Sequence, residues 1–424
     1  MKILFLYDFP LWGSGSGIYL RSLVQELTKL NHKVGIIAPD NRRFLEDKIK
    51  QYQVKTPQIP VFIGHPELKG AKRYSELSSR EITEIYKSFL DTTLDAVHNF
   101  EPDIIHVHHL SIISWVARYL YALKGIKYII TTHGSCLSNL KNNRKYLPLS
   151  DDAVRNARAI TTVSGNTRSH FLKMFGRHYA KNFHVIAGGV DLKLFNKKPD
   201  LEKINKKYKL EGKKIVLFCG RLTSEKGAKY LITSAKNIQG EVVIVGEGPE
   251  RKFLEDTIQQ KKITNVHLIG YMPHEDIIDF YFRADVFVAP SVVEEALGLS
   301  ILEAMAAKTP VIATRKGGIP LLVKHNQNGL FVRPRNSQAI ADACNKLLAN
   351  DELRHKLAEQ ARKTIEEKFS WKTIGEQFDK LYHRYGNGNG KHNNPLKKGL
   401  LPKSLNSHRT DSWEFCFIRV FMIQ

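Results

Sequence analysis

Cysteine is scarce in this chain. Only four cysteines occur in 424 residues, and they are Cys136, Cys219, Cys344 and Cys416. They stand far apart, and no two of them have the spacing of metal ligands. Together with the lack of an export signal, this distribution leads us to expect a protein of a reducing cytosol.

Long hydrophobic runs are missing too. No stretch approaches the roughly 18 uninterrupted apolar residues that a membrane-spanning helix needs. The N-terminal run at residues 3–7 is too short for the core of a signal peptide and is followed at once by Asp8. We therefore expect a cytoplasmic protein, either soluble or held peripherally on the inner face of the cell membrane.

Acidic residues are outnumbered by basic ones. The chain has 42 Asp and Glu against 65 Lys and Arg, a formal net charge of +23. Such an excess favours anionic partners, among them nucleic acid, acidic lipid headgroups and phosphorylated small molecules. A chain of this length also exceeds what one hydrophobic core usually supports, so two domains are expected.

Short apolar runs alternate with segments of helical periodicity along the first half of the chain. The segment after the first run places Leu20, Leu23 and Leu27 on one helical face. This β-α-β alternation predicts a parallel sheet with helices on both faces. The apolar runs predict strands at residues 3–7, 34–38, 104–108, 128–132, 160–163 and 184–187.

A lysine-rich polar stretch at residues 197–214 interrupts this pattern, and the alternation then restarts. Two doubly wound domains joined near residues 196–213 account for both halves. In the second half we expect strands at 215–219, 242–245, 266–269, 285–289 and 310–314, and helices at 337–349 and 351–368. The predicted boundaries are 1–196 and 214–369 for the two domains, 370–385 for a last helix, and 386–424 for a Gly- and Asn-rich tail without ordered structure.

Ligands of open α/β sheets bind at the carboxyl ends of the strands. The glycine-rich residues 13–17 (GSGSG) follow the first strand and lead into a helix, which favours an anion. Position 18 is isoleucine, so the third glycine of the dinucleotide pattern is absent, and a plain tight turn is an equal interpretation. His133 follows strand 128–132, and a structural and a functional role are both open for it.

Three other histidines, His106, His108 and His109, resemble a metal site at first sight. The first two share one face of a strand whereas the third points elsewhere, and no nearby carboxylate or cysteine completes a set. We interpret them as packing at a strand end and expect no metal.

Two cations, Arg221 and Lys226, follow the first strand of the second half on a loop between Gly220 and Gly227. Arginine offers a planar fork for two phosphate oxygens, and lysine adds a mobile point charge. The pair suits a diphosphate, although a solvated basic turn would have the same composition.

Glu295 and Glu303 are eight residues apart, with Gly298 between them. Because glycine favours a turn over a helix, we place Glu295 in a loop and Glu303 about one turn inside a helix at 299–307. The two carboxylates can then reach different parts of one ligand. As acceptors they suit the vicinal hydroxyls of a sugar or a ribose.

Taken in order, the motifs GSGSG, TTHG, VSGN, GGVD, GRLTSEKG, VGEGPE, PSVVEEALGLSILEAMA and GGIP resemble glycosyltransferase family 4, the retaining GT-B transferases. The resemblance runs from residue 1 to about residue 385, and the E-x7-E pair is its most specific element. It implies two Rossmann-like domains facing a central cleft, with the last helix crossing back to the first domain. It also implies transfer of a hexose from a UDP- or GDP-linked sugar to a hydroxyl acceptor, which could be a glycolipid, a polysaccharide or a small molecule.

The resemblance further implies roles for individual residues. Glu295 would hold hydroxyls of the donor sugar, and Glu303 would hold the nucleotide ribose. His133 would contact the sugar or the face of the cation that forms during transfer. Arg221 and Lys226 would hold the diphosphate. The backbone would add Gly15, Gly17, Gly298 and Leu299 near the diphosphate, and Tyr271 and Met272 at the base. No cofactor and no metal are implied, because the D-x-D pair of metal-dependent nucleotide-sugar enzymes is absent.

Four positions depart from the family pattern. Gly188 replaces the usual asparagine before GVD, which a left-handed turn would tolerate. Leu297 replaces phenylalanine and Lys308 replaces the glycine after EAMA, and we expect neither to alter the chemistry. Leu321 replaces the glutamate after GGIP, which bears on the donor pocket.

Other functions fit parts of the sequence. A dinucleotide oxidoreductase would explain residues 13–17. For its ribose-binding acid, however, the end of the second strand offers only Asp40, and Glu295 and Glu303 would have no role. A nucleotide-sugar epimerase or a sugar phosphorylase would share the GT-B fold but not this set of motifs. A non-catalytic basic protein would bind nucleic acid with a steep salt dependence, and we expect no such partner.

The acceptor is not identified by these motifs. Residues 170–183 interleave Phe and Tyr with Lys, Arg and His, as a helix on an anionic membrane surface would. A solvated basic face over an ordinary packed helix is the preferred interpretation, with the membrane surface as the alternative.

Overall fold

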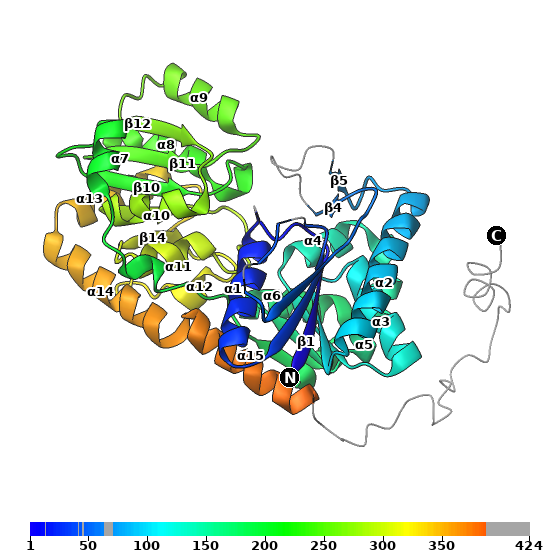
Figure 1. Cartoon of the computed structure of the whole chain (residues 1–424). Helices are drawn as coiled ribbons and strands as arrows, with labels where there is room; N and C mark the ends of the chain where they lie inside the picture. Colours follow the sequence, from blue (N-terminus) through cyan, green and yellow to red (C-terminus); the bar gives the residue numbers. More distant parts are fainter. Residues whose placement is uncertain (13, 41, 45, 63–70, 387–424) are drawn as a thin grey trace. The chain divides into compact units, whose positions relative to one another are not determined.

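The computed structural model describes residues 1–386 except 13, 41, 45 and 63–70. Two parallel β-sheets, each accompanied by helices, make up this part of the chain (Figure 1). The prediction of two Rossmann-like α/β domains is therefore confirmed. The predicted tail at 387–424 lies outside the described residues.

The first sheet has seven strands in the order β3-β2-β1-β6-β7-β8-β9, and all its neighbours pair in parallel. The strands are β1 (Lys2–Tyr7), β2 (Lys33–Ala38), β3 (Ile49–Gln53), β6 (Ile104–His108), β7 (Tyr128–Thr132), β8 (Ala159–Thr162) and β9 (Phe183–Val185). The strand order reverses between β1 and β6, and in open α/β sheets ligands bind at the carboxyl side of such a reversal.

The second sheet has six strands in the order β12-β11-β10-β13-β14-β15, again all parallel. The strands are β10 (Ile215–Cys219), β11 (Glu241–Val245), β12 (Val266–Gly270), β13 (Val286–Ala289), β14 (Val311–Thr314) and β15 (Leu330–Val332). Its strand order reverses between β10 and β13, so the loops after these strands occupy the equivalent position. A separate short pair joins β4 (Pro60–Val61) to β5 (Lys72–Arg73).

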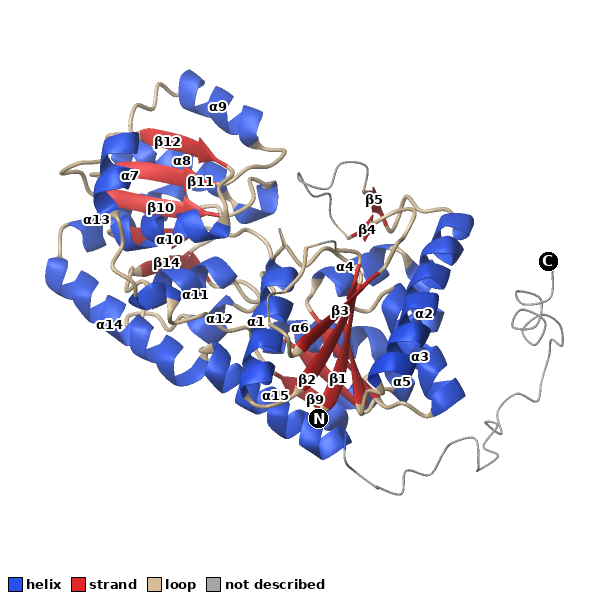
Figure 2. Ribbon diagram, in the orientation of Figure 1, coloured by secondary structure: helices blue, strands red, loops and turns tan. Residues whose placement is uncertain are grey.

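The helices of the two sheets are shown in Figure 2. Those with the first sheet are α1 (Gly15–Lys29), α2 (Ser79–Phe100), α3 (Ile112–Lys124), α4 (Ser135–Asn142), α5 (Leu147–Asn156) and α6 (Gly165–Phe175). The remaining ones are α7 (Leu201–Tyr208), α8 (Ala228–Ser234), α9 (Arg251–Gln260), α10 (His274–Arg283), α11 (Leu299–Ala306), α12 (Ile319–Leu322), α13 (Ser337–Leu348), α14 (Asp351–Lys368) and α15 (Trp371–Gly386).

The central strands are buried on both faces, which explains their continuous apolar sequences. In β10 the side chains of Val216 and Phe218 join one hydrophobic cluster, whereas Ile215, Leu217 and Cys219 join another. Alternate residues of a strand point to opposite faces of the sheet, so helices must cover both faces.

Several elements were not expected from the sequence, among them β3, β15 and α7. β3 and β15 lie at the outer ends of their sheets, and β3 (IKQYQ) is half exposed, so it lacks an apolar run. The lysine-rich stretch between the domains contains α7, which begins where the side chain of Asp200 accepts a hydrogen bond from the backbone of Lys203 at 3.1 Å. Its one buried side chain, Ile204, anchors it, and the helix packs against α10.

The last helix, α15, packs against α1 beside the first sheet. Just before α15, Ser370 forms an isolated β-bridge with Val190. The backbone N–H of Val190 donates to the carbonyl oxygen of Phe369 at 2.8 Å. Inside, the hydroxyl of Tyr382 on α15 lies 2.7 Å from His106 Nδ1 on β6. The final helix is thus bonded to the core of the first sheet.

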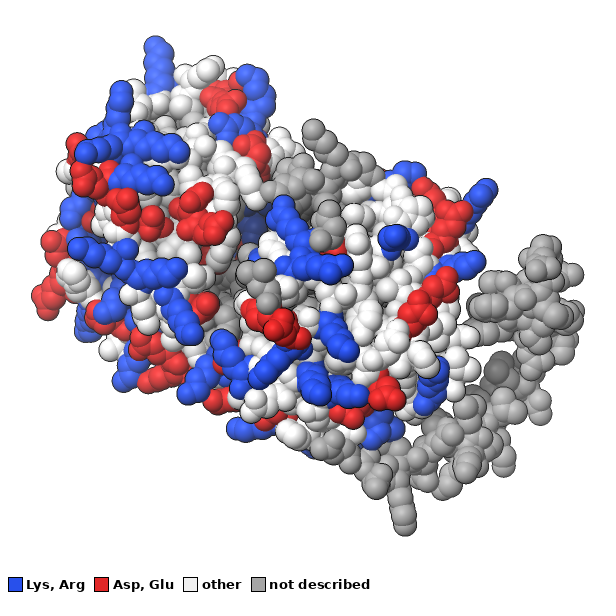
Figure 3. Space-filling view, viewed as in Figure 1, with Lys and Arg blue, Asp and Glu red and all other residues white. Residues whose placement is uncertain are grey.

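Basic and acidic side chains are interspersed on the face of the molecule drawn in Figure 3. The excess positive charge is therefore not gathered into one patch of a single sign on that face. In the part of the chain that the structure describes, no helix is both long enough and apolar enough to cross a membrane.

Candidate active site

The predicted site residues of the first domain follow β1 and β7. Gly15 and Gly17 lie in the first turn of α1, where the Ser14 side chain caps the helix by accepting a hydrogen bond from the Gly17 backbone at 3.0 Å. A Cβ atom at Gly17 would stand 2.4 Å from the carbonyl oxygen of Leu11, so no other residue fits there. A Cβ atom at Gly15 would meet the side chain of Leu299 at 3.2 Å, so two predicted site residues from different sheets are adjacent.

His133 follows β7, immediately before the residue that caps α4, Gly134. Gly134 has a φ of 94°, a backbone conformation that favours glycine, and a Cβ atom there would lie 3.1 Å from the Ala296 side chain. The structure therefore brings His133 to the loop that carries Glu295. Burial lowers the pKa of His133 to about 3, so the ring is neutral near pH 7.

The other three histidines, two in β6 and one directly after it, are buried, and burial lowers the pKa of each well below its ordinary value. His106 is held between the Tyr382 hydroxyl and the Thr131 hydroxyl, each 2.7 Å from a ring nitrogen. His108 Nδ1 lies 3.0 Å from His133 Nε2. His109 packs against aromatic rings, with its centroid 4.7 Å from that of His133. The four neutral rings form one packed group next to the site.

Within the described residues, one set of ligand-type side chains is close enough for a metal ion: His32, Asp379 and His383. Asp379 Oδ1 lies 2.8 Å from His32 Nε2 and 3.2 Å from His383 Nε2. His32 Nδ1 is buried without a partner, so a metal on Nε2 would leave a buried Nδ1–H with no acceptor. We interpret the set as hydrogen bonds that tie α15 to the turn after α1.

Lys226 and Glu295 form the closest ion pair among the predicted site residues. Lys226 Nζ donates to both carboxylate oxygens of Glu295, at 2.6 and 2.8 Å, and the Ser291 hydroxyl donates to one of them at 2.6 Å. Burial by itself would raise the pKa of Glu295, but Lys226 and Ser291 hold it below its ordinary value. The carboxylate is therefore ionised and fixed in place.

Arg221 lies on the same loop as Lys226 and is partly buried. Burial lowers the pKa of Arg221, although Glu225 opposes this shift. At Gly227, which has a φ of 72°, a Cβ atom would stand 2.2 Å from the carbonyl oxygen of Pro290. Glycine is thus required for the loop that carries both cations to lie directly against the end of β13.

Glu303 lies in α11, whose start at Leu299 agrees with the predicted position. Gly298, with a φ of 96°, provides the left-handed residue before the helix. His274 Nε2 donates to one carboxylate oxygen of Glu303 at 2.6 Å, and the Tyr281 hydroxyl donates to the other at 2.7 Å. Glu303 in turn raises the pKa of His274. The two predicted carboxylates thus have separate sets of partners.

Tyr271 and Met272 follow β12 and precede α10. Tyr271 is 55% exposed, whereas Met272 packs against the hydrophobic core. Ser291, His274 and Tyr281 were not recognised from the sequence as partners of the site. Ser291 and His274 each follow a predicted strand or its loop, and this position could have indicated that they belong to the site. Tyr281 lies inside a helix, where the sequence gives no such indication.

Two departures from the family pattern lie against each other. A Cβ atom at Gly188 would stand 3.0 Å from the side chain of Leu297 and 3.2 Å from Tyr19. The expected left-handed turn at Gly188 is wrong, because its φ lies outside that region. Instead, the side chains of Leu297 and Tyr19 pack closely against it. Lys308, which replaces a glycine, does adopt a left-handed φ of 58°. Leu321 is exposed on α12.

The phenylalanine side chains of the basic segment 170–183 point inward. Phe171, Phe175 and Phe183 are buried, and the ring of Phe171 lies 4.7 Å from that of Phe175 and 4.9 Å from that of Phe183. This arrangement favours a packed helix with a solvated basic face, because the apolar groups that would enter a membrane are occupied.

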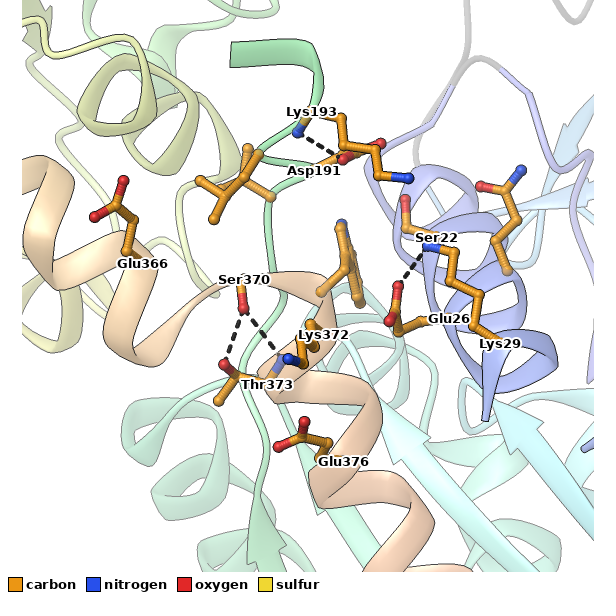
Figure 4. Close-up of a pocket in the computed structure, with 14 residues that line it drawn as sticks. Ser22, Glu26, Lys29, Asp191, Lys193, Glu366, Ser370, Lys372, Thr373 and Glu376 are labelled. Carbon is orange, nitrogen blue, oxygen red and sulfur yellow. Dashed lines mark hydrogen bonds and ion pairs between the residues drawn. The ribbon is translucent and has the colours of Figure 1, made fainter. Parts of the chain in front are cut away.

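A cavity of about 560 Å³ lies where the chain passes between the two sheets (Figure 4). It is lined by α1, by residues 190–193 and by the start of α15, and it carries charges of both signs, such as Lys29 bonded to Glu26 at 2.7 Å. None of the predicted site residues lines it, so it is distinct from the site at the strand ends.

Two family models match the chain. "Glycosyltransferase Family 4" matches residues 13–194, and "Glycosyl transferases group 1" matches residues 200–364. An uncharacterised glycosyltransferase of Methanocaldococcus jannaschii is 36% identical over 189 residues, which cover 43% of this chain and 48% of that protein. The D-inositol 3-phosphate glycosyltransferase of Corynebacterium urealyticum is 28% identical, over 89% of this chain and 93% of that protein.

The fold has solved counterparts. The crystal structure of Anabaena HepE in complex with UDP-glucose matches with a TM-score of 0.72 and 21% identity, over 91% of this chain and all of HepE. Sucrose-phosphate synthase from Thermosynechococcus elongatus matches with a TM-score of 0.75 and 22% identity, over 91% of this chain and 98% of that chain. These matches show that the chain has the GT-B fold. The two family models, which match residues 13–194 and 200–364, show that the chain belongs to glycosyltransferase family 4.

Proposed function

We propose that the protein is a retaining glycosyltransferase that moves a hexose from a nucleotide-diphosphate sugar to a hydroxyl acceptor. The observation that carries this proposal is the Lys226–Glu295 pair, bonded at 2.6 and 2.8 Å at the carboxyl edge of the second sheet. The pair presents a cation for phosphate and a carboxylate for sugar hydroxyls side by side. Arg221 on the same loop supplies a second cation.

The donor is a UDP- or GDP-linked sugar. HepE, which shares the fold, was crystallised with UDP-glucose, and this supports a nucleotide sugar for the present chain. Glu303 receives the ribose hydroxyls, and the loop of Tyr271 and Met272 receives the base. His274 and Tyr281 already donate to Glu303, so its carboxylate is held ready to accept further hydrogen bonds from the ribose.

The chemical step relies on positioned charge. As the bond to the sugar breaks, negative charge grows on the leaving diphosphate, where Lys226 and Arg221 stabilise it. The leaving diphosphate takes the proton of the acceptor hydroxyl, and the acceptor attacks from the same face, which retains the configuration. Glu295 holds Lys226 in place before the donor arrives and contacts the hydroxyls of the sugar afterwards. Neither a cofactor nor a metal takes part in this scheme.

The acceptor side is formed by the first domain, where His133 lies next to the loop of Glu295. Its ring is neutral, so it serves as a hydrogen-bonding group to the sugar and not as a cation. Glycolipids, polysaccharides and small molecules all provide suitable hydroxyls. Peripheral binding to an anionic membrane stays a prediction.

Release of UDP or GDP from a panel of nucleotide sugars tests the proposal, measured with and without hydroxyl acceptors. We expect the release of UDP or GDP from one donor to rise when its acceptor is added. An α-linked donor should give an α-linked product. A sugar epimerised without transfer, or phosphate acting as the acceptor, would identify a different GT-B enzyme. Absence of release from every donor would contradict the proposal.

A further inference from the structure

The contact between His133 and His108 contains a single proton. Both rings are neutral, because burial lowers both pKa values far below 7, so each ring has one N–H. His108 Nδ1 and His133 Nε2 are 3.0 Å apart, a distance at which one nitrogen must donate and the other accept.

The two rings meet edge to edge. Their planes differ by only 29° and their centroids are 5.1 Å apart. The distance between the centroids is nearly the N···N distance plus the distance from centroid to nitrogen in each ring. The two centroids and the two nitrogens therefore lie almost on one line, and the N···N line lies close to both ring planes. The lone pair and the N–H of an imidazole lie in the ring plane, and the geometry is therefore that of a true hydrogen bond.

The tautomers of the two rings are consequently coupled. If His108 donates from Nδ1, then His133 Nε2 is the acceptor and the proton of His133 must be on Nδ1. If His133 donates from Nε2 instead, its Nδ1 has no proton, and His108 must carry its own proton on Nε2. No other combination of two neutral rings satisfies the contact.

The surroundings of His108 favour the first arrangement. His108 is fully buried and its Nε2 has no hydrogen-bond partner. The second arrangement would place an N–H at this position without an acceptor, and orphaned buried N–H groups are rarer in proteins than under-satisfied acceptors. His133 is partly exposed, so its Nδ1–H is on the accessible member of the pair.

We propose that His108 is a positioning residue, which holds His133 in the Nδ1–H tautomer so that His133 donates a hydrogen bond to an oxygen of the donor sugar. An N–H can donate to any oxygen of the sugar, including those that carry no proton, whereas a bare ring nitrogen cannot. His108 itself touches no substrate. The inference rests on the proposed function for its purpose, but the tautomer is a property of the free protein.

Nitrogen-15 NMR of the histidine rings in the free, full-length protein tests the tautomer directly, with His133 assigned by comparison with His133→Gln. We expect the shift of a protonated nitrogen at Nδ1 of His133 and that of an unprotonated one at Nε2. A proton on Nε2 of His133 would overturn the proposal and leave the proposed function intact.

Two variants of nearly equal shape test the consequence. In His108→Asn the amide nitrogen is bonded to Cγ, as Nδ1 of histidine is, and can donate from the same place, whereas His108→Leu has no donor. We expect the asparagine variant to keep the Nδ1–H tautomer of His133 and most of kcat. The leucine variant should show mixed tautomers of His133 and about a tenfold lower kcat with unchanged donor KM.

Because both variants lose the same ring volume, a purely structural role of His108 predicts equal effects in both. Equal kcat in the two variants together with the same His133 tautomer in both would therefore overturn the proposal. If the wild type releases no nucleotide from any donor, the proposed function fails while the NMR result still decides the tautomer.

Discussion

Replacing Lys226 by alanine should reduce stability and catalysis by separable amounts. The substitution removes the cation that donates to both oxygens of Glu295. It leaves a carboxylate that is only 17% exposed, to which the Ser291 hydroxyl still donates. A buried charge without its partner destabilises the protein, because the free-energy cost of its desolvation is no longer offset.

The loss of stability can be estimated from the exposure of the pair. A hydrogen bond to a charged group is worth roughly 1.5–3 kcal/mol. The Lys226 side chain is 36% exposed, so solvent screens the interaction, and we take the lower end, about 1.5 kcal/mol. The effect on kcat should be larger, roughly 10²–10³-fold or about 2.7–4 kcal/mol, because the charge that Lys226 meets grows in the transition state.

The stability difference should depend on pH. In the wild type the pKa of Glu295 is lowered below its ordinary 4.5, so its contribution is present above pH 4.5 and is lost as the pH falls through the lowered value. Without Lys226, burial raises the pKa of Glu295 instead, and its charge destabilises the protein above that value. The two proteins should therefore approach equal stability only as the pH falls through the lowered pKa of Glu295 in the wild type.

The double variant Lys226→Ala/Glu295→Gln separates the two effects. Glutamine at position 295 removes the uncompensated charge and can still accept from Ser291, so thermal or urea unfolding should recover most of the lost stability. Nucleotide release should stay as slow as in the single variant. A double variant no more stable than Lys226→Ala, or a single variant with normal kcat, would refute this account of the pair.

Three further predictions concern the rest of the site and the chain. Glu303→Gln should raise the donor KM about tenfold with little change in kcat, since a ribose contact is similar in the ground and transition states; steady-state kinetics showing mainly a kcat loss would contradict this. Transfer should persist in excess EDTA, and abolition that Mg²⁺ or Mn²⁺ reverses would show that a metal takes part. Deleting residues 387–424 should leave the melting temperature unchanged, whereas deletion from Ser370 should lower it, because α15 buries Trp371, Phe378 and Tyr382; equal melting of the two truncations would contradict the placement of the end of the fold.

The sequence alone determined the central strands and the start of α11. Strands such as β10 are buried on both faces, and a continuous apolar run is the local consequence, so it can be recognised without knowledge of the neighbours. The position of α11 likewise follows from Gly298, whose left-handed backbone ends the loop. Both features depend on residues close together in the chain.

Tertiary structure decided everything that depends on distant neighbours. The edge strand β3 is half exposed and has no apolar run, and helix α7 buries only Ile204, so packing defines both elements. Lys226 and Glu295 are 69 residues apart, and no spacing rule links them.

The same reason explains why two local patterns could be interpreted in more than one way. Leu297 and Tyr19 pack closely against Gly188, whereas the sequence suggested that a left-handed turn would account for glycine at this position. Phe171, Phe175 and Phe183 pack inward, which supports the preferred interpretation of 170–183 as a packed helix over the alternative of a membrane surface. A local pattern reports which side chains are apolar, but only the packed chain determines what covers them.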